Sequence, residues 1–143
     1  MEIEEKLRIL KSLDTKSLTE RVHQYEGELE KAMTAEADFK NSNHQFLGSG
    51  DCQEVKRILA ELAVMAPETN EAGKKTTIAD REAWLQRQRI ENSELSEAIQ
   101  KQRQIAFLID GHQIKVEMAR RRLEGTRAVL ALKTQQIAFL ASS

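Results

Sequence analysis

The sequence contains few of the residues that end helices or cross-link small folds. Its 143 residues include one proline, six glycines and one cysteine, and aromatic residues make up 4%. The lone Cys52 excludes an internal disulfide, and the scarcity of β-branched and aromatic residues argues against a sheet-rich fold. Ala, Glu, Leu, Lys and Arg together supply about half of the chain, a share typical of coiled coils and long helices. The composition therefore predicts an all-α protein.

Long apolar runs and a leader-like start are also missing. No apolar segment approaches the roughly 20 residues that span a bilayer. The acidic start, MEIEEKLRIL, does not match a secretory signal peptide. We therefore expect a cytoplasmic protein that makes no contact with a membrane.

Charge is divided unevenly along the chain, although the formal net charge is only −1. Residues 1–66 carry 9 basic and 13 acidic side chains, whereas residues 67–143 carry 13 basic and 10 acidic ones. An acidic front half suits packing against a basic back half, within one chain or between chains. A basic back half also suits contact with nucleic acid, which is the alternative interpretation.

Three helices are predicted in the front half, at about 2–13, 17–47 and 51–65, because apolar residues recur there at spacings of three and four. The apolar face of the first helix is interrupted at Asp14. Either a new helix starts at the capping box Ser17–Glu20, or one helix bends there.

The second of these helices carries a heptad pattern over residues 22–46. Gly48 and Gly50 are expected to end it, because glycine takes positive φ at little cost. Asp51 is predicted to cap the next helix as the first residue of a capping box. Residues 67–76 are polar and begin with the single proline, so they are interpreted as a linker.

A strict seven-residue stride runs through the back half of the chain from Leu95, with Gln102 as its polar member. Such a stride predicts a coiled-coil seam with a left-handed supercoil. We expect its apolar members to form the seam of an oligomer: Leu95, Ile109, Val116, Leu123, Leu130 and Ile137.

The pair Asp110–Gly111 separates two possible architectures. Asp-Gly is a common turn pair, but the stride passes through it without a phase slip, and glycine inside a helix costs only about 1 kcal/mol relative to alanine. One continuous helix over 77–140, capped at Thr77, makes the fold an elongated antiparallel helical hairpin or coiled coil. A turn at Asp110–Gly111 would instead give a three-helix bundle. In both cases 1–143 is expected to form a single helical domain.

Chemically reactive side chains are sparse. Glu20 and His23 have the Glu-x-x-His spacing of di-iron bundles, but a second such pair is missing from the sequence. Cys52 has no histidine close to it along the chain. The sequence therefore predicts no catalysis, no metal centre, no cofactor and no small-molecule substrate.

Basic residues of the back half are candidates for contact with nucleic acid: Lys101, Arg103, Arg120, Arg121, Arg122 and Arg127. A basic helix can follow a phosphate backbone, but no aromatic residues alternate with these cations to stack on bases. Carboxylates within one helical turn can pair with Arg120 and Arg121. Arg122 lacks one at that spacing, and Arg127 has only Glu124, three residues before it. These two are predicted to be the freer cations.

Three apolar residues are candidate partner contacts. Trp84 lies near the start of the last helix, where it either packs under the neighbouring loop or forms part of an interface. Phe139 and Leu140, near the end of the chain, would be exposed on an isolated helix. We therefore expect a homo-oligomer that also binds another protein.

Two segments, ADREAWLQRQ (79–88) and RRRLEGTRAVLALKTQQI (120–137), resemble small helical proteins encoded in bacteriophage and prophage genomes. The shared features are a Glu-Ala-Trp near the start of a long helix and an Arg/Leu-rich second half, and the resemblance covers 77–140. These proteins have no firmly assigned activity, so the resemblance transfers no functional residue. The expected function is a non-enzymatic helical interaction or scaffold protein. The alternative is a phage-type DNA-associated accessory factor in replication or recombination.

Overall fold

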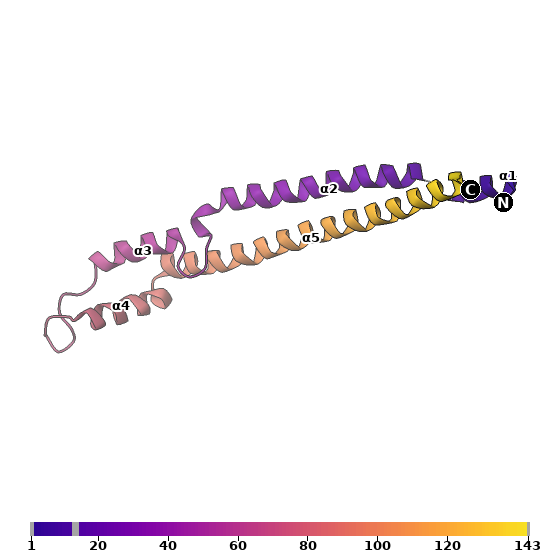
Figure 1. Ribbon diagram of the computed structural model, residues 1–143. Coiled ribbons are helices and arrows are strands. Elements are labelled where there is room, and N and C mark those ends of the chain that lie inside the picture. The colour runs from indigo at the N-terminus through magenta and orange to yellow at the C-terminus, as the bar shows by residue number, and fades with distance from the viewer. Residues whose placement is uncertain (1, 13–14, 143) are drawn as a thin grey trace. The chain divides into compact units, whose positions relative to one another are not determined.

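The computed structural model describes residues 2–12 and 15–142, and the side chains of residues 2–9 and 15–142. Its helices, in chain order, are α1 (Ile3–Ser12), α2 (Thr15–Ser42), the 3-10 helix η1 (His44–Phe46), α3 (Gln53–Val64), α4 (Ile78–Glu91) and α5 (Ser93–Ser142) (Figure 1). The protein is all-α, and the long C-terminal helix α5 packs antiparallel to α2, as predicted. Contacts within the chain define two compact units: unit 1 comprises Met1–Ala37 and Gly111–Ser143, and unit 2 comprises Asp38–Asp110.

Asp110 and Gly111 both lie inside α5. Among the described residues, positive φ values occur only at Gly48, Gly50 and Gly73. The chain therefore does not turn at Asp110–Gly111, and the three-helix bundle is excluded.

The helix expected over 77–140 is in fact two helices. α4 ends at Glu91, and Asn92 has a ψ of 117°, outside the helical range. The Asn92 side-chain oxygen accepts a hydrogen bond from Leu95 N at 3.0 Å, which caps the start of α5. The seven-residue stride begins at Leu95, directly after this break.

Two predicted helix caps are wrong and one is confirmed. α2 begins at Thr15, so Ser17 lies inside the helix. α3 begins after Cys52, with no side-chain cap, and Asp51 bonds elsewhere. Thr77 caps α4 with the predicted capping box, in which the Thr77 hydroxyl and the carboxylate three residues later each accept from the other's backbone N–H. The interruption expected at Asp14 lies outside the described residues.

Residues 67–76, expected as a linker, form a closed loop. Thr69 and Lys75 form an isolated antiparallel bridge. The Asn70 side-chain oxygen accepts hydrogen bonds from two backbone N–H groups of the loop, each at 3.0 Å. Gly73 turns the chain with a φ of 77°, a conformation that favours glycine. These contacts give the loop a defined shape beside α4.

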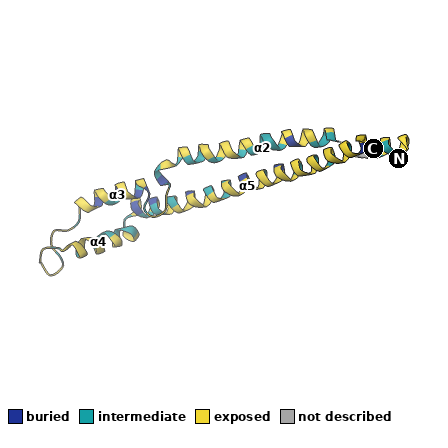
Figure 2. Ribbon diagram, viewed as in Figure 1, coloured by how far each residue is buried: buried dark blue, intermediate teal, exposed yellow. Residues whose placement is uncertain are grey.

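The core of unit 2 forms where α3 meets the first turns of α5 (Figure 2). α3 contributes Val55, Ile58 and Leu62, which recur at helical spacing on one face. Their buried neighbours in the cluster are Phe46, Cys52, Leu95, Ala98 and Ile105. Val55 and Leu95 are completely buried, so the first residue of the stride lies at the centre of this core.

Unit 1 is held together by the heptad seam between α2 and α5. On α5 the seam consists of the stride residues from Val116 onward and of the residues three positions after each of them. On α2 it consists of the heptad positions that include Val22. Every side chain at these positions in unit 1 is buried or half-buried. The most buried are Val22, Val116, Leu123 and Leu140. Within a single chain, therefore, α2 already covers the α5 face that the stride defines.

We expect Gly111→Ala to raise the free energy of unfolding by about 0.5–1 kcal/mol, because alanine favours a helix interior over glycine. The added Cβ would meet nothing within 4 Å, so no clash opposes this gain. Urea unfolding followed by circular dichroism measures the change.

The matched control is Gly50→Ala, which places a side chain at a φ of +80° and should lower the free energy of unfolding. A clear loss of stability in Gly111→Ala would contradict the helical conformation at this residue.

Candidate functional site

Gln102, the polar member of the stride, fastens the loop between α2 and α3. Its Nε2 donates to the carbonyl oxygens of Gly48 at 3.3 Å and Gly50 at 2.6 Å. Its Oε1 accepts from the backbone N–H of Cys52 at 3.3 Å. One side chain on α5 therefore satisfies three backbone groups of this loop. The polar interruption of the stride has a structural cause within the chain.

A bidentate ion pair joins the same loop to α4. Arg89 donates from Nη1 to Oδ1 of Asp51 at 2.9 Å and from Nη2 to Oδ2 at 2.7 Å. The hydrogen bond from Arg89 lowers the pKa of Asp51, and the hydrogen bond to Asp51 raises the pKa of Arg89. The two residues are 38 positions apart, and no local pattern in the sequence connects them.

The side chains considered for chemistry do not form a site in the part of the chain that the structure describes. Cys52 is 2% exposed and belongs to the core of unit 2, so its thiol is shielded from substrates. His23 is exposed, and its Nδ1 lies 3.9 Å from a carboxylate oxygen of Glu26, one turn along α2. Residues 2–12 and 15–142 contain no group of three or more His, Cys, Asp or Glu side chains able to hold a metal ion.

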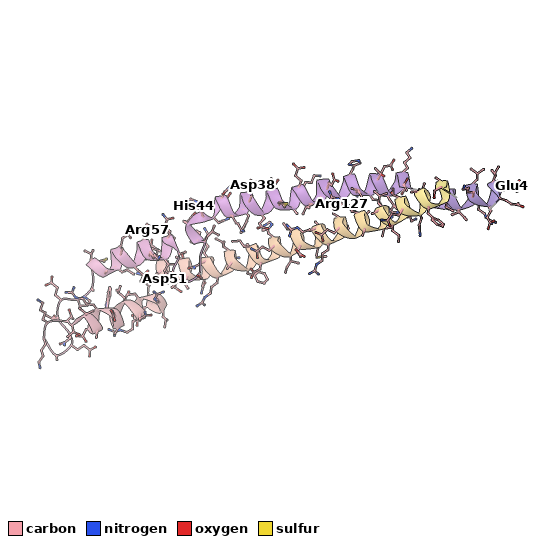
Figure 3. All side chains as sticks on the ribbon, viewed as in Figure 1. Glu4, Asp38, His44, Asp51, Arg57 and Arg127 are labelled. Carbon is pink, nitrogen blue, oxygen red and sulfur yellow. The ribbon has the colours of Figure 1, made fainter. Side chains whose placement is uncertain are left out.

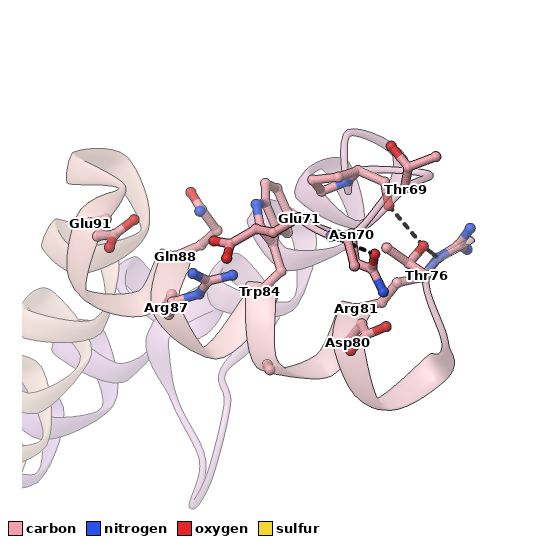
Figure 4. A pocket seen from close by; sticks show the side chains of 13 residues that line it. Thr69, Asn70, Glu71, Thr76, Asp80, Arg81, Trp84, Arg87, Gln88 and Glu91 are labelled. Carbon is pink, nitrogen blue, oxygen red and sulfur yellow. Dashed lines mark hydrogen bonds between the residues drawn. The ribbon is translucent and has the colours of Figure 1, made fainter. Parts of the chain in front are cut away.

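A recess of about 620 Å³ opens between the 67–76 loop and α4 (Figure 4). Trp84 lines it from α4, is half-buried, and packs against the core of unit 2. Polar groups around the recess are used by the loop itself: the Thr76 hydroxyl donates to the carbonyl of Pro67 and accepts from Nε of Arg81. These contacts favour a packing role for Trp84 beneath the loop.

Arg122 and Arg127, predicted to be the freer cations, both bind carboxylates of α2. Arg122 Nη1 lies 3.3 Å from Glu28 Oε2, and the guanidinium group lies 5.4 Å from the centroid of the Tyr25 ring. Arg127 Nη2 lies 3.1 Å from Glu26 Oε1 (Figure 3). Both arginines flank the seam on α5, and both glutamates flank it on α2. Aligning the two heptad patterns in the sequence would have revealed these pairs.

The remaining basic candidates are distributed over both units. Arg120 and Arg121 in unit 1 bind Glu117 at 3.3 and 3.0 Å, as their spacing predicts. Lys101 in unit 2 places its Nζ 4.7 Å from the centroid of an aromatic ring on η1. Arg103, also in unit 2, is exposed. Contact between these residues and nucleic acid stays a prediction.

No family model, curated protein or solved structure matches the chain. The resemblance of 79–88 and 120–137 to phage-encoded helical proteins therefore stays a prediction.

A second apolar face runs along α5 away from the seam, and we call it the α5 stripe. Its members and their exposed fractions are Ile114 (59%), Met118 (60%), Val129 (45%), Leu132 (56%) and Phe139 (70%). At 3.6 residues per turn they all lie within about 40° of one line along the helix. Gly111 and Gly125 lie along the same line of α5, and we call all positions on this line the row. None of the described helices is long and apolar enough to cross a membrane.

The α5 stripe includes only one of the two apolar residues that were expected at a partner contact near the chain end. Phe139 belongs to the stripe and is exposed, whereas Leu140 lies on the seam side and is only 6% exposed. The sequence showed that both were apolar, but only the register of α5 decided which of them is accessible.

We expect Gln102→Ala to lower the free energy of unfolding by about 1–2 kcal/mol, because three backbone groups of the loop lose their partner. Urea unfolding monitored by circular dichroism measures the loss. Gln104→Ala, on an exposed position of the same helix, is the control and should be nearly neutral. Equal effects of the two substitutions would show that the loop contacts contribute nothing.

The pair of Asp51 and Arg89 predicts a pH dependence of stability. The pKa of Asp51 is lowered in the folded state. The stability that its carboxylate contributes is therefore fully present above the pKa of an unfolded aspartate, about 3.9. This stability is lost as the pH falls through the lower pKa of the folded state. Asp51→Asn should therefore destabilise the protein by about 1 kcal/mol at pH 7, since the pair is partly exposed.

The difference between wild type and Asp51→Asn should shrink below about pH 4. Urea unfolding at pH 7 and at pH 3 measures both values, with Asp38→Asn at an exposed position as the control. A difference that stays constant over this range would contradict the assignment.

Proposed function

We propose that this protein is a non-enzymatic helical scaffold, which self-associates and binds another macromolecule. The α5 stripe carries this proposal. It consists of five large apolar side chains, each between 45 and 70% exposed, on a helix whose other side already packs on α2. Contiguous exposed apolar surfaces of this kind are typical of protein interaction sites.

The small core of unit 1 supports the same proposal. Among its described residues, the buried hydrophobic side chains are Val22, Val116, Leu123 and Leu140. A unit with so few buried residues leaves much of its apolar surface in water. A helix that is apolar on two sides needs neighbours on both, and α2 covers one of them.

Contact with DNA is the weaker candidate. Four of the basic candidates are arginines in unit 1, and each binds a glutamate carboxylate of its own chain. A phosphate backbone would have to compete with these carboxylates for the guanidinium groups. No observation on the described residues favours nucleic acid over a protein partner.

The proposal predicts that the purified full-length chain is a dimer whose population rises with concentration. Multi-angle light scattering over a series of loading concentrations measures the mass. A monomer at every workable concentration would remove self-association from the proposal.

A gel-shift or fluorescence-anisotropy titration with single- and double-stranded DNA at low salt tests the alternative. We expect no binding under these conditions. Binding that weakens steeply as salt is added would favour the DNA-associated function instead.

A further inference from the structure

We propose that the α5 stripe packs against the α5 stripe of a second copy of the chain, with the two α5 helices parallel. This inference rests on the proposed function and specifies which face self-associates, with which partner and in which orientation.

The heptad seam of α5 is poorly suited to pairing with itself. Both edges of this seam are basic in unit 1, because Lys115 and Arg122 follow one edge and Arg120 and Arg127 follow the other. Two such seams placed face to face would bring cations against cations. On α2, by contrast, carboxylates flank the seam and bind Arg122 and Arg127. The seam thus selects α2 of its own chain, and self-association needs another face.

The α5 stripe has the dimensions and relief of a helix-packing surface. From Ile114 to Phe139 it extends about 38 Å along α5, at 1.5 Å per residue. Gly111 and Gly125 lie in the row, and a Cβ at either position would meet nothing within 4 Å. The surface is therefore low at these two points. In a parallel pair in register each glycine lies opposite its own copy, so the two backbones can approach closely there.

The charges along the two edges of the stripe set the orientation of the second copy. Glu117 and Glu124 follow one edge, and Lys115 and Arg122 follow the other. In a parallel pair the acidic edge of each helix faces the basic edge of its partner. Glu117 of one copy then lies near Arg122 of the other, five residues further along. Each of them shares its charge with the ion pair that it makes within its own chain, Glu117 with Arg120 and Arg121, and Arg122 with Glu28. In an antiparallel pair each edge would face its like, and the charges would repel.

Polar residues in the row limit the strength of this contact. Arg121 lies in the row, where a parallel pair places it near Arg121 of the second copy. Its side chain is 77% exposed, and its Nε binds Glu117 at the acidic edge, which offsets its charge. Gln136 falls between Leu132 and Phe139. Polar positions of this kind specify register at the expense of stability, so the dimer should dissociate on dilution.

The first test removes apolar side chains from the stripe in the full-length chain. Ile114→Asp combined with Leu132→Asp should convert the dimer to a monomer, as measured by sedimentation equilibrium, with the helical circular dichroism retained. Ile78→Asp combined with Ile90→Asp makes the same change at two exposed positions of α4 and should leave the dimer intact.

The outcomes of this test separate the inference from the proposed function. A wild-type dimer that survives Ile114→Asp with Leu132→Asp overturns the stripe as the contact face but leaves self-association standing. A wild-type chain that is monomeric throughout overturns both.

The second test fixes the orientation by cross-linking. Gln136→Cys places a thiol in the row near one end of α5, where a parallel pair brings it next to its copy. Mild oxidation should give a disulfide-linked dimer on a non-reducing gel. Ala131→Cys, exposed on another side of the same helix, should not form one, and buried Cys52 serves as the internal control in the unmodified chain. Equal cross-linking of the two variants, or none with Gln136→Cys, overturns the parallel arrangement.

The third test reverses the acidic edge. Glu117→Lys with Glu124→Lys makes both edges basic and should raise the dimer dissociation constant by about tenfold or more at low salt. Glu20→Lys with Glu30→Lys makes the same charge change on exposed positions of α2 and should leave the constant unchanged. An equal effect of the two variants, or no effect of the first, overturns the charge-matched pairing.

Discussion

The seam between α2 and α5, with one ion pair along each of its edges, is the interaction on which the rest of unit 1 depends. Arg122 binds Glu28 on one side of the seam, and Arg127 binds Glu26 on the other. These residues occupy equivalent heptad positions on the two helices, which is the pairing that an antiparallel arrangement produces. Exposed ion pairs contribute at most about 1 kcal/mol each. The buried seam residues therefore supply most of the stability, and the two ion pairs fit the antiparallel direction of the helices.

In unit 2 the loop after α2 takes its shape from side chains on other helices. Gln102 on α5 satisfies backbone groups of Gly48, Gly50 and Cys52, and Arg89 on α4 holds Asp51. Two glycines with positive φ let the loop turn tightly enough for a single glutamine to reach three of its backbone groups. As a result, Cys52 is drawn into the core and belongs to the packing of the unit.

The functional consequence follows from the two faces of α5. In unit 1 the face that repeats every seven residues is covered by α2. The side chains of the α5 stripe stay 45–70% exposed, and Ile9 of α1 lies beside Leu132 and Phe139 in a shared recess. The oligomer contact expected at Leu123, Leu130 and their equivalents is thus occupied inside one chain. The large apolar residues that remain exposed in unit 1 of α5 come from positions that the stride does not include. A helix with opposed apolar faces is suited to joining an internal contact to an external one.

Helical class, the seven-residue register and the helical state of Asp110–Gly111 were all determined by the sequence, because periodicity and composition act locally and α5 preserves its phase through the glycine. The Thr77 cap was determined in the same way, by residues three apart. The tertiary structure alone decided the partner of Asp51 and the exposure of Phe139 beside a buried Leu140. Each of these depends on what lies across from a residue rather than next to it. Local spacing cannot report contacts between side chains that are tens of residues apart.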